Sequence, residues 1–336
     1  MNDAAEPRPP IGSGHRPIES LITPSSHAGP RRRHLNRVMA HRMAARQTFP
    51  GIIVRAMRPL QWTKNAVLLA ALVFDRKLVE PDAVARAVVA VLVFCALSSG
   101  VYLINDVRDA ASDRLHPAKR HRPVSAGELS PRVAIAVAIL LFGVGLATAW
   151  FVRPPFMAVS AGYVALMVLY SLGLKKVVIL DVFAIAAGFV LRAAGGAVAL
   201  KVTISPWLLV CTMLLALFIG FGKRRHEIVA VAHATDHRSS LSGYSLTFLD
   251  QLIGTVASAT VMAYSIYTFD ASNVPRNHAM MLTIPFVAYA VFRYLFLIHR
   301  SELSGTPEAL LFADRPLLLA IVAWGLSSIT ILQLTG

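Results

Sequence analysis

Apolar segments of membrane-spanning length recur along this chain from residue 59 almost to its end. We place nine of them, at 59–75, 83–104, 132–151, 156–173, 178–199, 205–222, 248–268, 279–299 and 316–335. A helix of about 20 apolar residues crosses a bilayer and satisfies its own backbone polar groups there. The pattern therefore predicts an all-α integral membrane protein, a bundle of about nine transmembrane helices.

The composition excludes an ordinary water-soluble protein. Hydrophobic residues make up 56% of the 336 residues and charged residues only 15%, whereas a soluble domain carries about 25% charged residues. In a soluble protein, the net charge of +15 would indicate a nucleic-acid partner. Because no polar domain here is large enough to hold a duplex, we expect no nucleic acid and assign the charge to basic loops beside anionic lipid.

Residues 1–50 differ from the rest of the chain, and we separate them from a transmembrane domain at 51–336. The first thirty residues are rich in Pro, Gly and Ser and lack apolar periodicity, which predicts disorder. The next twenty interleave arginines with apolar residues, which predicts a basic amphipathic helix on the membrane surface. This arm lacks the apolar core of a secretory signal, and its Arg-rich composition leaves a mitochondrial transit peptide as an alternative.

Lysine and arginine are unevenly distributed among the loops. They concentrate before the first apolar segment and after the second, fourth and sixth segments, and the intervening loops contain few of them. Because positively charged loops stay in the cytoplasm, the N-terminus is predicted to be cytoplasmic. An odd number of spans then places the C-terminus outside. We expect a multi-pass protein of the cell (inner) membrane.

The most informative stretch lies at the end of the second apolar segment. It contains Asn105, Asp106, Asp109 and Asp113 in the pattern N-D-x-x-D-x-x-x-D. On a helix the three aspartates lie at i, i+3 and i+7, which is one face. Such carboxylates repel each other unless a cation lies among them, and hard oxygen donors in an incomplete shell suit Mg²⁺. We predict that these four residues bind Mg²⁺ and are catalytic; carboxylates paired with neighbouring arginines are the alternative.

Fixed cations accompany this acidic motif. Lys119 and Arg122 follow it closely, and Lys64 belongs to the same side of the membrane. A substrate that carries a diphosphate needs a metal ion to bridge its phosphate oxygens and basic side chains to neutralise the remaining charge. We therefore predict that Lys64, Lys119 and Arg122 bind such a substrate.

The segment NDVRDAASD at 105–113 resembles the first signature of the UbiA superfamily of intramembrane prenyltransferases. The resemblance implies a UbiA-like nine-helix fold with a lateral opening to lipid, and a requirement for Mg²⁺. A closer likeness, over roughly 55–335, is to the branch that transfers phosphoribose to a polyprenyl phosphate. The motifs that carry it are RPLQWTKN at 58–65, NDVRDAASDRLHPAKRHRP at 105–123, YSLGLK at 170–175, DVFAIAAGFVLRAAGG at 181–196, GKRRHE at 222–227 and GTPEALLFADRP at 305–316.

The resemblance to this branch implies a reaction. It is the Mg²⁺-dependent transfer of 5-phosphoribose from phosphoribosyl pyrophosphate (PRPP) to a polyprenyl phosphate such as decaprenyl phosphate. The products are polyprenyl-phosphoryl-5-phosphoribose, a precursor of arabinose donors for cell-envelope glycans, and diphosphate. On this interpretation 51–336 is a catalytic domain whose active site faces the cytoplasm.

One motif of the aryl-prenylating members is missing from this chain. Those members carry a second acidic motif of the D-x-x-x-D type after the sixth span, where this chain has Lys223, Arg224 and Arg225 with Glu227 as the one nearby acid. A site with cations in place of a second metal clamp suits a second anion, such as a lipid phosphate. We assign Lys223 and Arg224 to substrate binding on this argument.

Four further residues are weaker candidates for substrate binding. Tyr102 lies one turn before Asp106, and Tyr170 and Lys175 lie at the cytoplasmic end of the fourth span. Arg192 lies about 16 Å along its helix from the cytoplasmic end, at 1.5 Å per residue, which is deep for a charge. The alternatives are an interface aromatic for Tyr102 and a snorkelling side chain for the two basic residues.

Two other functions stay open. An aromatic polyprenyltransferase of the same superfamily, acting on an acceptor like 4-hydroxybenzoate, is disfavoured by the missing second acidic motif. A non-enzymatic lipid transporter would show inverted hydropathy repeats with broken helices, and we find neither. Whether the chain forms a homo-oligomer also stays open.

Overall fold

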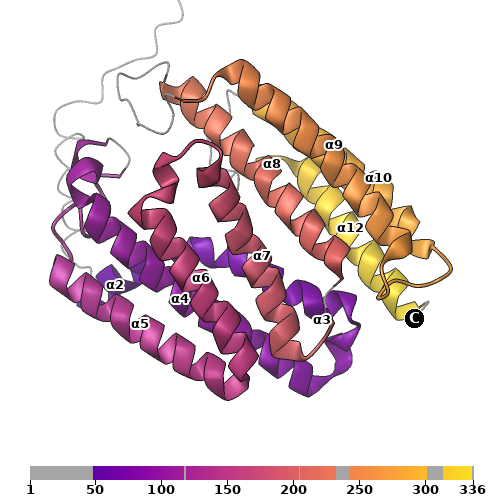
Figure 1. Ribbon diagram of the computed structural model, residues 1–336, viewed down its shortest axis with the longest axis horizontal. Helices are drawn as coiled ribbons and strands as arrows, with labels where there is room; N and C mark the ends of the chain where they lie inside the picture. Colours follow the sequence, from indigo (N-terminus) through magenta and orange to yellow (C-terminus); the bar gives the residue numbers. More distant parts are fainter. Residues whose placement is uncertain (1–47, 117–118, 204, 232–242, 301–312, 335–336) are drawn as a thin grey trace, which may run out of the picture. The chain divides into compact units, whose positions relative to one another are not determined.

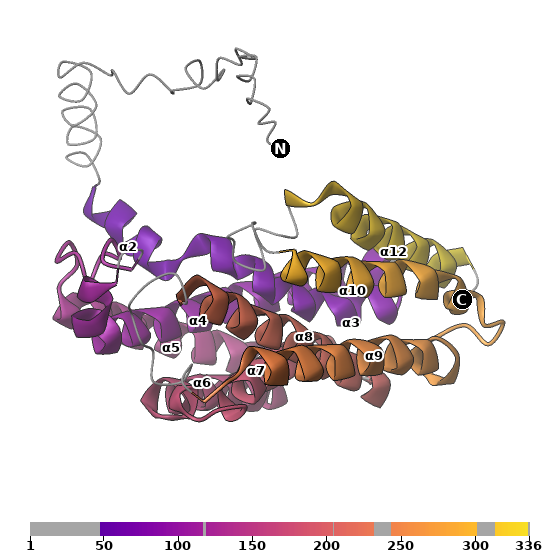
Figure 2. The same cartoon turned by 90° about the horizontal axis from the view of Figure 1, so that it is seen from above.

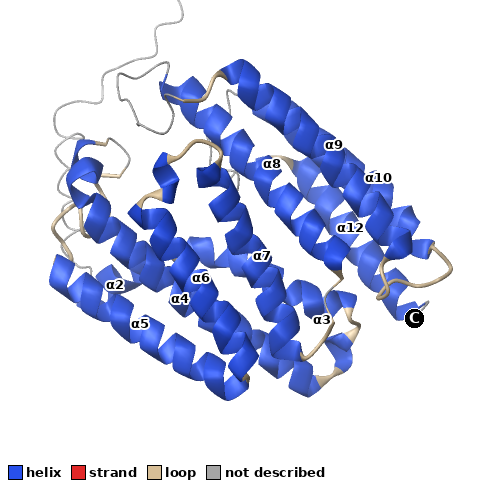
Figure 3. Ribbon diagram, in the orientation of Figure 1, coloured by secondary structure: helices blue, strands red, loops and turns tan. Residues whose placement is uncertain are grey.

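The computed structural model describes residues 48–116, 119–203, 205–231, 243–300 and 313–334. All regular structure in these ranges is helical (Figure 3). Eight helices there are long and apolar enough to cross a membrane, so the protein is a multi-pass, all-α membrane protein. The described residues between 50 and 334 form one bundle of long helices (Figures 1 and 2). The predicted arm at 1–50 lies almost entirely outside the described residues and stays a prediction.

The eight long helices are α4 (Pro81–Leu115), α5 (Pro131–Val152), α6 (Pro154–Leu172), α7 (Leu180–Leu200), α8 (Pro206–Val231), α9 (Leu246–Asp270), α10 (Ile284–His299) and α12 (Arg315–Leu334). The shorter ones are α2 (Phe49–Met57), α3 (Ala70–Phe74) and four 3-10 helices: η1 (Pro59–Leu69), η2 (Lys77–Val79), η3 (Leu174–Lys176) and η4 (Ala279–Thr283), which leads directly into α10.

Proline and serine residues mark where several helices begin. Helices α4, α5, α6 and α10 each carry proline in the first turn, where its missing N–H costs no hydrogen bond. Ser130 caps α5 by accepting from the Val133 N–H, and Ser245 caps α9 by accepting from the Phe248 N–H. These helices begin at residues 131 and 246, close to the predicted 132 and 248.

The first predicted span, 59–75, has a different form from the others. It consists of η1 followed by the short helix α3. Trp62 Nε1 donates to Ser99 Oγ of α4 at 3.1 Å. Asn65 Nδ2 lies 3.2 Å from Cys95 Sγ of the same helix. At about 2 Å per residue, η1 alone extends roughly 22 Å. That this segment is a ninth crossing stays a prediction, as does the cytoplasmic N-terminus.

Helix η1 packs against both α4 and α7. At Gly196 of α7, a Cβ atom would lie 2.2 Å from the carbonyl oxygen of Leu68. Glycine is therefore required there, because it lets the two backbones touch. Leu68 is itself buried in a cluster with Phe94 and Phe156, which joins η1, α4 and α6.

A second and larger cluster of buried side chains joins α7, α8, α9 and α10. Phe218, Phe221 and Ile253 lie at its centre. The outer faces of the bundle expose large apolar side chains, among them Phe151 and Leu319. Such exposure is expected of helices that face lipid, because lipid tails are as apolar as the side chains.

Helix α4 continues about three turns beyond the predicted span 83–104. The chain that follows folds back against it. Val124 and Leu129 are buried together with Leu103 of α4, and Arg114 Nε donates to the Ser125 carbonyl at 3.3 Å. This return places the basic residues near 119–122 beside the acidic motif.

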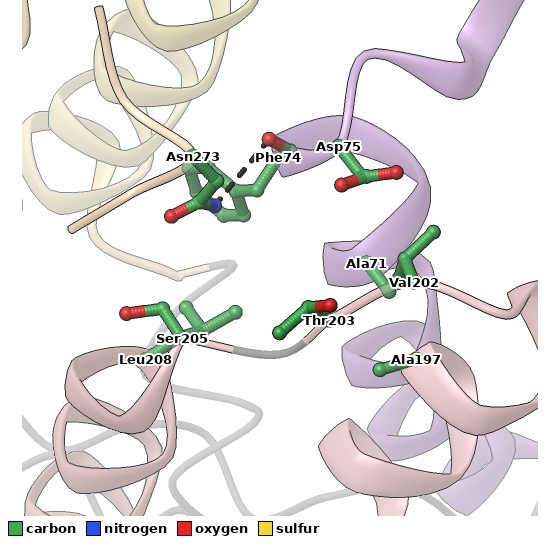
Figure 4. Close-up of a pocket in the computed structure, with 9 residues that line it drawn as sticks. All are labelled: Ala71, Phe74, Asp75, Ala197, Val202, Thr203, Ser205, Leu208 and Asn273. Carbon is green, nitrogen blue, oxygen red and sulfur yellow. Dashed lines mark hydrogen bonds between the residues drawn. The ribbon is translucent and has the colours of Figure 1, made fainter. Parts of the chain in front are cut away.

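A small pocket lies beside the C-terminal end of α7. It is lined by residues of α3, the end of α7 and the start of α8, and its polar members are Asp75, Thr203, Ser205 and Asn273 (Figure 4). Its interior is about 10 Å³, which suits about one water molecule. We assign no substrate to it.

Candidate active site

Asp106 and Asp113 lie two turns apart on the buried face of α4. Asp106 is 0% exposed and Asp113 is 3% exposed. Arg122 bridges them, since its Nη1 lies 3.2 Å from Asp106 Oδ1 and 2.6 Å from Asp113 Oδ2. The i, i+7 spacing thus brings two carboxylates to one guanidinium.

Asn105 and Asp109 lie one turn apart and share Lys175. The Lys175 ammonium lies 2.7 and 2.8 Å from the two Asp109 oxygens and 3.4 Å from Asn105 Oδ1. Lys175 belongs to η3, which connects α6 to α7. Arg108 fixes that connection against α4 by donating to the Leu172 carbonyl at 2.6 Å.

Arg58 is a member of the site that sequence reasoning missed. Its guanidinium forms an ion pair with Asp106 and lies 5.0 Å from the centre of the Tyr102 ring. Burial lowers the pKa of Arg58 below its ordinary value, although Asp106 opposes that shift. The backbone of Arg58 is left-handed (φ 57°), and such conformations cluster at functional sites. The motif RPLQWTKN begins with this residue, but the sequence analysis predicts a role only for Lys64 within it.

The other predicted residues differ in how deeply they are buried. Lys64, Tyr102, Lys119 and Tyr170 are half-buried, and Lys223 is exposed on α8.

Arg192 is buried in the middle of α7, with 5% of its surface exposed. It donates to Asn65 Oδ1 (2.8 Å), to the Gly188 carbonyl (3.1 Å) and to the Tyr163 hydroxyl (2.7 Å). The guanidinium also lies over the rings of Tyr163 and Phe189, at 4.6 and 5.3 Å from their centres. Arg192 therefore links η1, α6 and α7 through neutral partners.

Arg224 lies in a separate buried cluster. Its Nε is 2.7 Å from Asp181 Oδ2, and its Nη1 forms an ion pair with Glu227. Tyr244 donates to Asp181 Oδ1 at 2.8 Å and accepts from the Ile179 N–H at 2.6 Å. Arg224 is thus paired with two carboxylates, as Arg122 is, and its role in binding a substrate anion stays a prediction. Its ion pair with Asp181 joins the start of α7 to the end of α8.

A family model described as the UbiA prenyltransferase family matches residues 66–314. The chain belongs to this family. It is 34% identical over 277 residues to the decaprenyl-phosphate phosphoribosyltransferase of Mycobacterium tuberculosis, a match that covers 81% of this chain and 91% of that relative. It is 32% identical over 284 residues to the protein of the same name from Corynebacterium glutamicum, covering 81% and 84% of the two chains.

Solved structures share the fold of this UbiA family member. A UbiA homologue from Archaeoglobus fulgidus bound to GPP and Mg²⁺ superimposes with a TM-score of 0.66 at 18% identity, covering 84% of this chain and 100% of that one. The same homologue bound to DMAPP and Mg²⁺ gives a TM-score of 0.65. The UbiA-like fold predicted from the acidic motif is therefore confirmed.

Two observations on α4 fit a divalent cation in this UbiA family member. Asp106 Oδ2 is buried and accepts no hydrogen bond from any described residue. The Lys175 ammonium, itself a cation, lies among three oxygens of Asn105 and Asp109. Carboxylate and amide oxygens are the donors that Mg²⁺ prefers.

The four predicted metal ligands do not converge on one point. Within the described ranges, no three His, Cys, Asp or Glu side chains lie close enough together to hold a metal ion. Each carboxylate faces a basic side chain instead. Because Mg²⁺ commonly takes one or two carboxylates and completes its shell with substrate phosphate and water, this arrangement suits an ion that is shared with a substrate.

Proposed function

We propose that this protein transfers 5-phosphoribose from PRPP to a polyprenyl phosphate, and that the acceptor is decaprenyl phosphate or a close relative. The observation that carries the proposal is the asymmetry of the site. One helix face is acidic, and the end of α8 carries Lys223, Arg224 and Arg225 in place of a second acidic motif. The relatives named decaprenyl-phosphate phosphoribosyltransferase, at 32 to 34% identity, support it.

The water-soluble donor binds at the acidic face, which we place on the cytoplasmic side of the cell membrane. Lys175 and Arg122 already approach the carboxylates, and Lys119 lies in the same return loop. These cations neutralise the negative charge of a diphosphate and fix its orientation through charge-assisted hydrogen bonds. One or two of the side chains of Asn105, Asp106, Asp109 and Asp113 would hold Mg²⁺ together with that diphosphate.

The reaction breaks the bond between C1 of the ribose and the diphosphate oxygen, and diphosphate leaves with the electron pair. When bound, Mg²⁺ would stabilise the charge that develops on this leaving group. A phosphate oxygen of the lipid forms the new bond to C1. Because the lipid phosphate is already ionised, the chain needs no strong general base. Its residues contribute by holding the two anions in line, and such positioning can account for much of a rate enhancement.

The product, polyprenyl-phosphoryl-5-phosphoribose, would serve as a precursor of arabinose donors for cell-envelope glycans. The acceptor keeps its apolar chain in the bilayer and reaches the site between helices, while PRPP enters from the cytoplasm. Both substrates therefore meet at the cytoplasmic ends of α4, α6 and α7.

A two-substrate assay tests the proposal. Purified protein receives Mg²⁺ and either PRPP with a polyprenyl phosphate, or a prenyl diphosphate with 4-hydroxybenzoate, and diphosphate release is measured. We expect release only with the first pair. Release only with the second pair would identify an aromatic prenyltransferase and overturn the proposal.

A further inference from the structure

Among the residues that the structure describes, no carboxylate forms an ion pair with Arg192. Helices η1 and α6 contain no acidic residue, and α4 contains none between Ala83 and Asn105. The one acidic residue of α7, Asp181, lies eleven residues away and is paired with Arg224. Every hydrogen-bond acceptor that Arg192 has among the described residues is neutral.

A buried charge without a counter-charge is unfavourable in the core of a membrane protein. The neutral partners of Arg192 accept hydrogen bonds from its N–H groups but do not neutralise its positive charge. In a medium of low dielectric constant, the electrostatic potential of that charge extends farther than it would in water. A purely structural link between helices would be made at lower cost by a neutral side chain. The positive field therefore points to an anion that binds nearby.

The region around Arg192 contains a second cation and leads to the acidic face. Lys64 precedes Asn65, the η1 residue that accepts a hydrogen bond from Arg192. Tyr102 lies on α4 about one turn beyond Ser99, which binds η1 through Trp62. Tyr102 lies beneath Arg58, which pairs with Asp106. Successive side-chain neighbours thus connect the middle of α7 to the buried carboxylate of α4.

PRPP and the polyprenyl phosphate, the two anionic substrates, reach the site by different routes. PRPP is water-soluble and approaches from the loops, whereas the lipid acceptor must keep its chain in the bilayer. At the end of α8, where we predicted the lipid phosphate, Arg224 pairs with Asp181 and Glu227, and Arg225 pairs with Asp250. The positive region below the acidic face offers charge of the required sign at the required depth.

We propose that the phosphate group of the lipid acceptor binds in this region, against Lys64 and Tyr102, with Arg192 as the fixed charge behind Tyr163. This proposal moves Lys64 from the diphosphate, to which the sequence analysis assigned it, to the lipid phosphate. Lys64 and Tyr102 are half-buried and contact the phosphate, while Arg192 and Tyr163 are buried and act through their charge and position. This inference rests on the proposed function, since it names the place of the second substrate in that reaction.

The test compares Arg192→Gln, which removes the charge, with Arg192→Lys, which keeps the charge and loses the three-way hydrogen bonding. Arg153→Gln is the matched control. Arg153 also donates to a carbonyl of α7, since its Nη1 lies 2.8 Å from the Val198 oxygen near the C-terminal end of that helix. Lys64→Gln is a second charge-removing variant. The wild type and all four variants are assayed for the KM of polyprenyl phosphate and of PRPP, and for thermal stability.

We expect Arg192→Gln and Lys64→Gln to raise the KM of the polyprenyl phosphate about tenfold, with the KM of PRPP changed less than twofold. Arg192→Lys and Arg153→Gln should stay within about threefold of the wild type. A rise in the KM of PRPP alone would mean that these residues bind PRPP and not the lipid phosphate. Equal defects in Arg192→Lys and Arg192→Gln would mean that Arg192 only holds the helices together. Either result overturns the inference.

A binding measurement separates this inference from the proposed function. Native mass spectrometry compares retention of a polyprenyl phosphate with that of the uncharged polyprenol of equal length, without PRPP. We expect the wild type to prefer the phosphate and Arg192→Gln and Lys64→Gln to lose that preference. If the wild type transfers no phosphoribose, the proposed function fails while this readout still decides on the phosphate site; an unchanged preference in both variants overturns the site.

Discussion

The carboxylates of α4 share their cations. Arg122 serves both Asp106 and Asp113, and Lys175 serves both Asn105 and Asp109. Removing one member of such a set therefore leaves a charge without its partner, which costs more than the loss of a single exposed ion pair. The half-buried members are better for testing chemistry than the fully buried ones, because they disturb folding less.

Asp109 is the most informative aspartate to change. Its side chain is 22% exposed, so Asp109→Asn keeps the shape of the site and removes one charge without leaving a cavity. We expect turnover to fall on the order of 100-fold or more, as when other groups that stabilise transition-state charge are removed. Steady-state rates with PRPP and polyprenyl phosphate measure this. Asp82→Asn, in the exposed first turn of the same helix, is the control, and equal effects would refute the assignment.

Lys175 and Lys176 are a matched pair of adjacent lysines. Lys175 binds Asp109, and Lys176 is exposed. A hydrogen bond between charged groups contributes about 1.5–3 kcal/mol, which corresponds to about 10- to 100-fold in affinity. We expect Lys175→Met to raise the KM of PRPP by that factor and Lys176→Met to leave it nearly unchanged. Similar KM values for the two variants would mean that only the general positive charge of the loop matters.

At the residue scale, sequence spacing identified the acidic face of α4, because i, i+3 and i+7 positions share a helix face regardless of what packs against it. Partners from distant segments had no such signal. Arg58 reaches Asp106 across 48 positions, and Asn65 reaches Arg192 across 127. Nothing in the local pattern around Arg224 indicated that Asp181 would neutralise it.

The membrane helices are predictable from the sequence where an uninterrupted apolar run defines both of their ends. Uniform apolar runs predicted segments close to α5, α9 and α12. The segment 59–75 follows no single rule, since polar side chains interrupt its apolar run. Its 3-10 form depends on contacts with α4 and α7, which a local pattern does not contain.

The contact between η1 and α7 at Gly196 gives a prediction about this element. An added Cβ would meet the backbone of Leu68 at 2.2 Å, which side-chain movement cannot relieve. We expect Gly196→Ala to destabilise the protein by about 1–3 kcal/mol and to lower activity, because η1 carries Lys64 and Asn65. Thermal unfolding in detergent and the transferase assay measure the two effects.

Gly162→Ala on α6 is the control for this prediction, since nothing lies within 4 Å of the Cβ that it adds. We expect it to be neutral or slightly stabilising, because alanine favours the helix over glycine. If Gly196→Ala were as harmless as Gly162→Ala, the close backbone contact between η1 and α7 would be wrong.

At the scale of the whole molecule, charge is arranged by depth. The acidic motif and its cations lie at one end of α4. The guanidinium of Arg192, whose described hydrogen-bond partners are all neutral, lies deeper in the bundle. Large apolar side chains cover the outside. The sequence predicted the first and last of these layers from composition and hydropathy. It did not predict that the deeper layer lies next to the acidic one, because that depends on how α4, α6 and α7 pack.

The number of membrane crossings decides where the C-terminus lies. With a cytoplasmic N-terminus and a crossing at 59–75, the nine predicted spans place residue 336 outside the cytoplasm. We expect a reporter that is active only outside the cytoplasm to be active when fused after Gly336, and inactive when inserted in the basic loop after α4. An inactive C-terminal fusion, with a second reporter showing it to be cytoplasmic, would mean that 59–75 does not cross.

The central claim is that phosphoribose ends up on a polyprenyl phosphate. The most direct measurement is mass spectrometry of the lipids formed when purified protein is supplied with Mg²⁺, mixed polyprenyl phosphates and PRPP that carries ¹³C in its ribose. The account predicts new lipids heavier than each acceptor by one labelled phosphoribosyl group, and their loss in Asp109→Asn. Lipids without label, under conditions in which the protein is folded and binds polyprenyl phosphate, would contradict it.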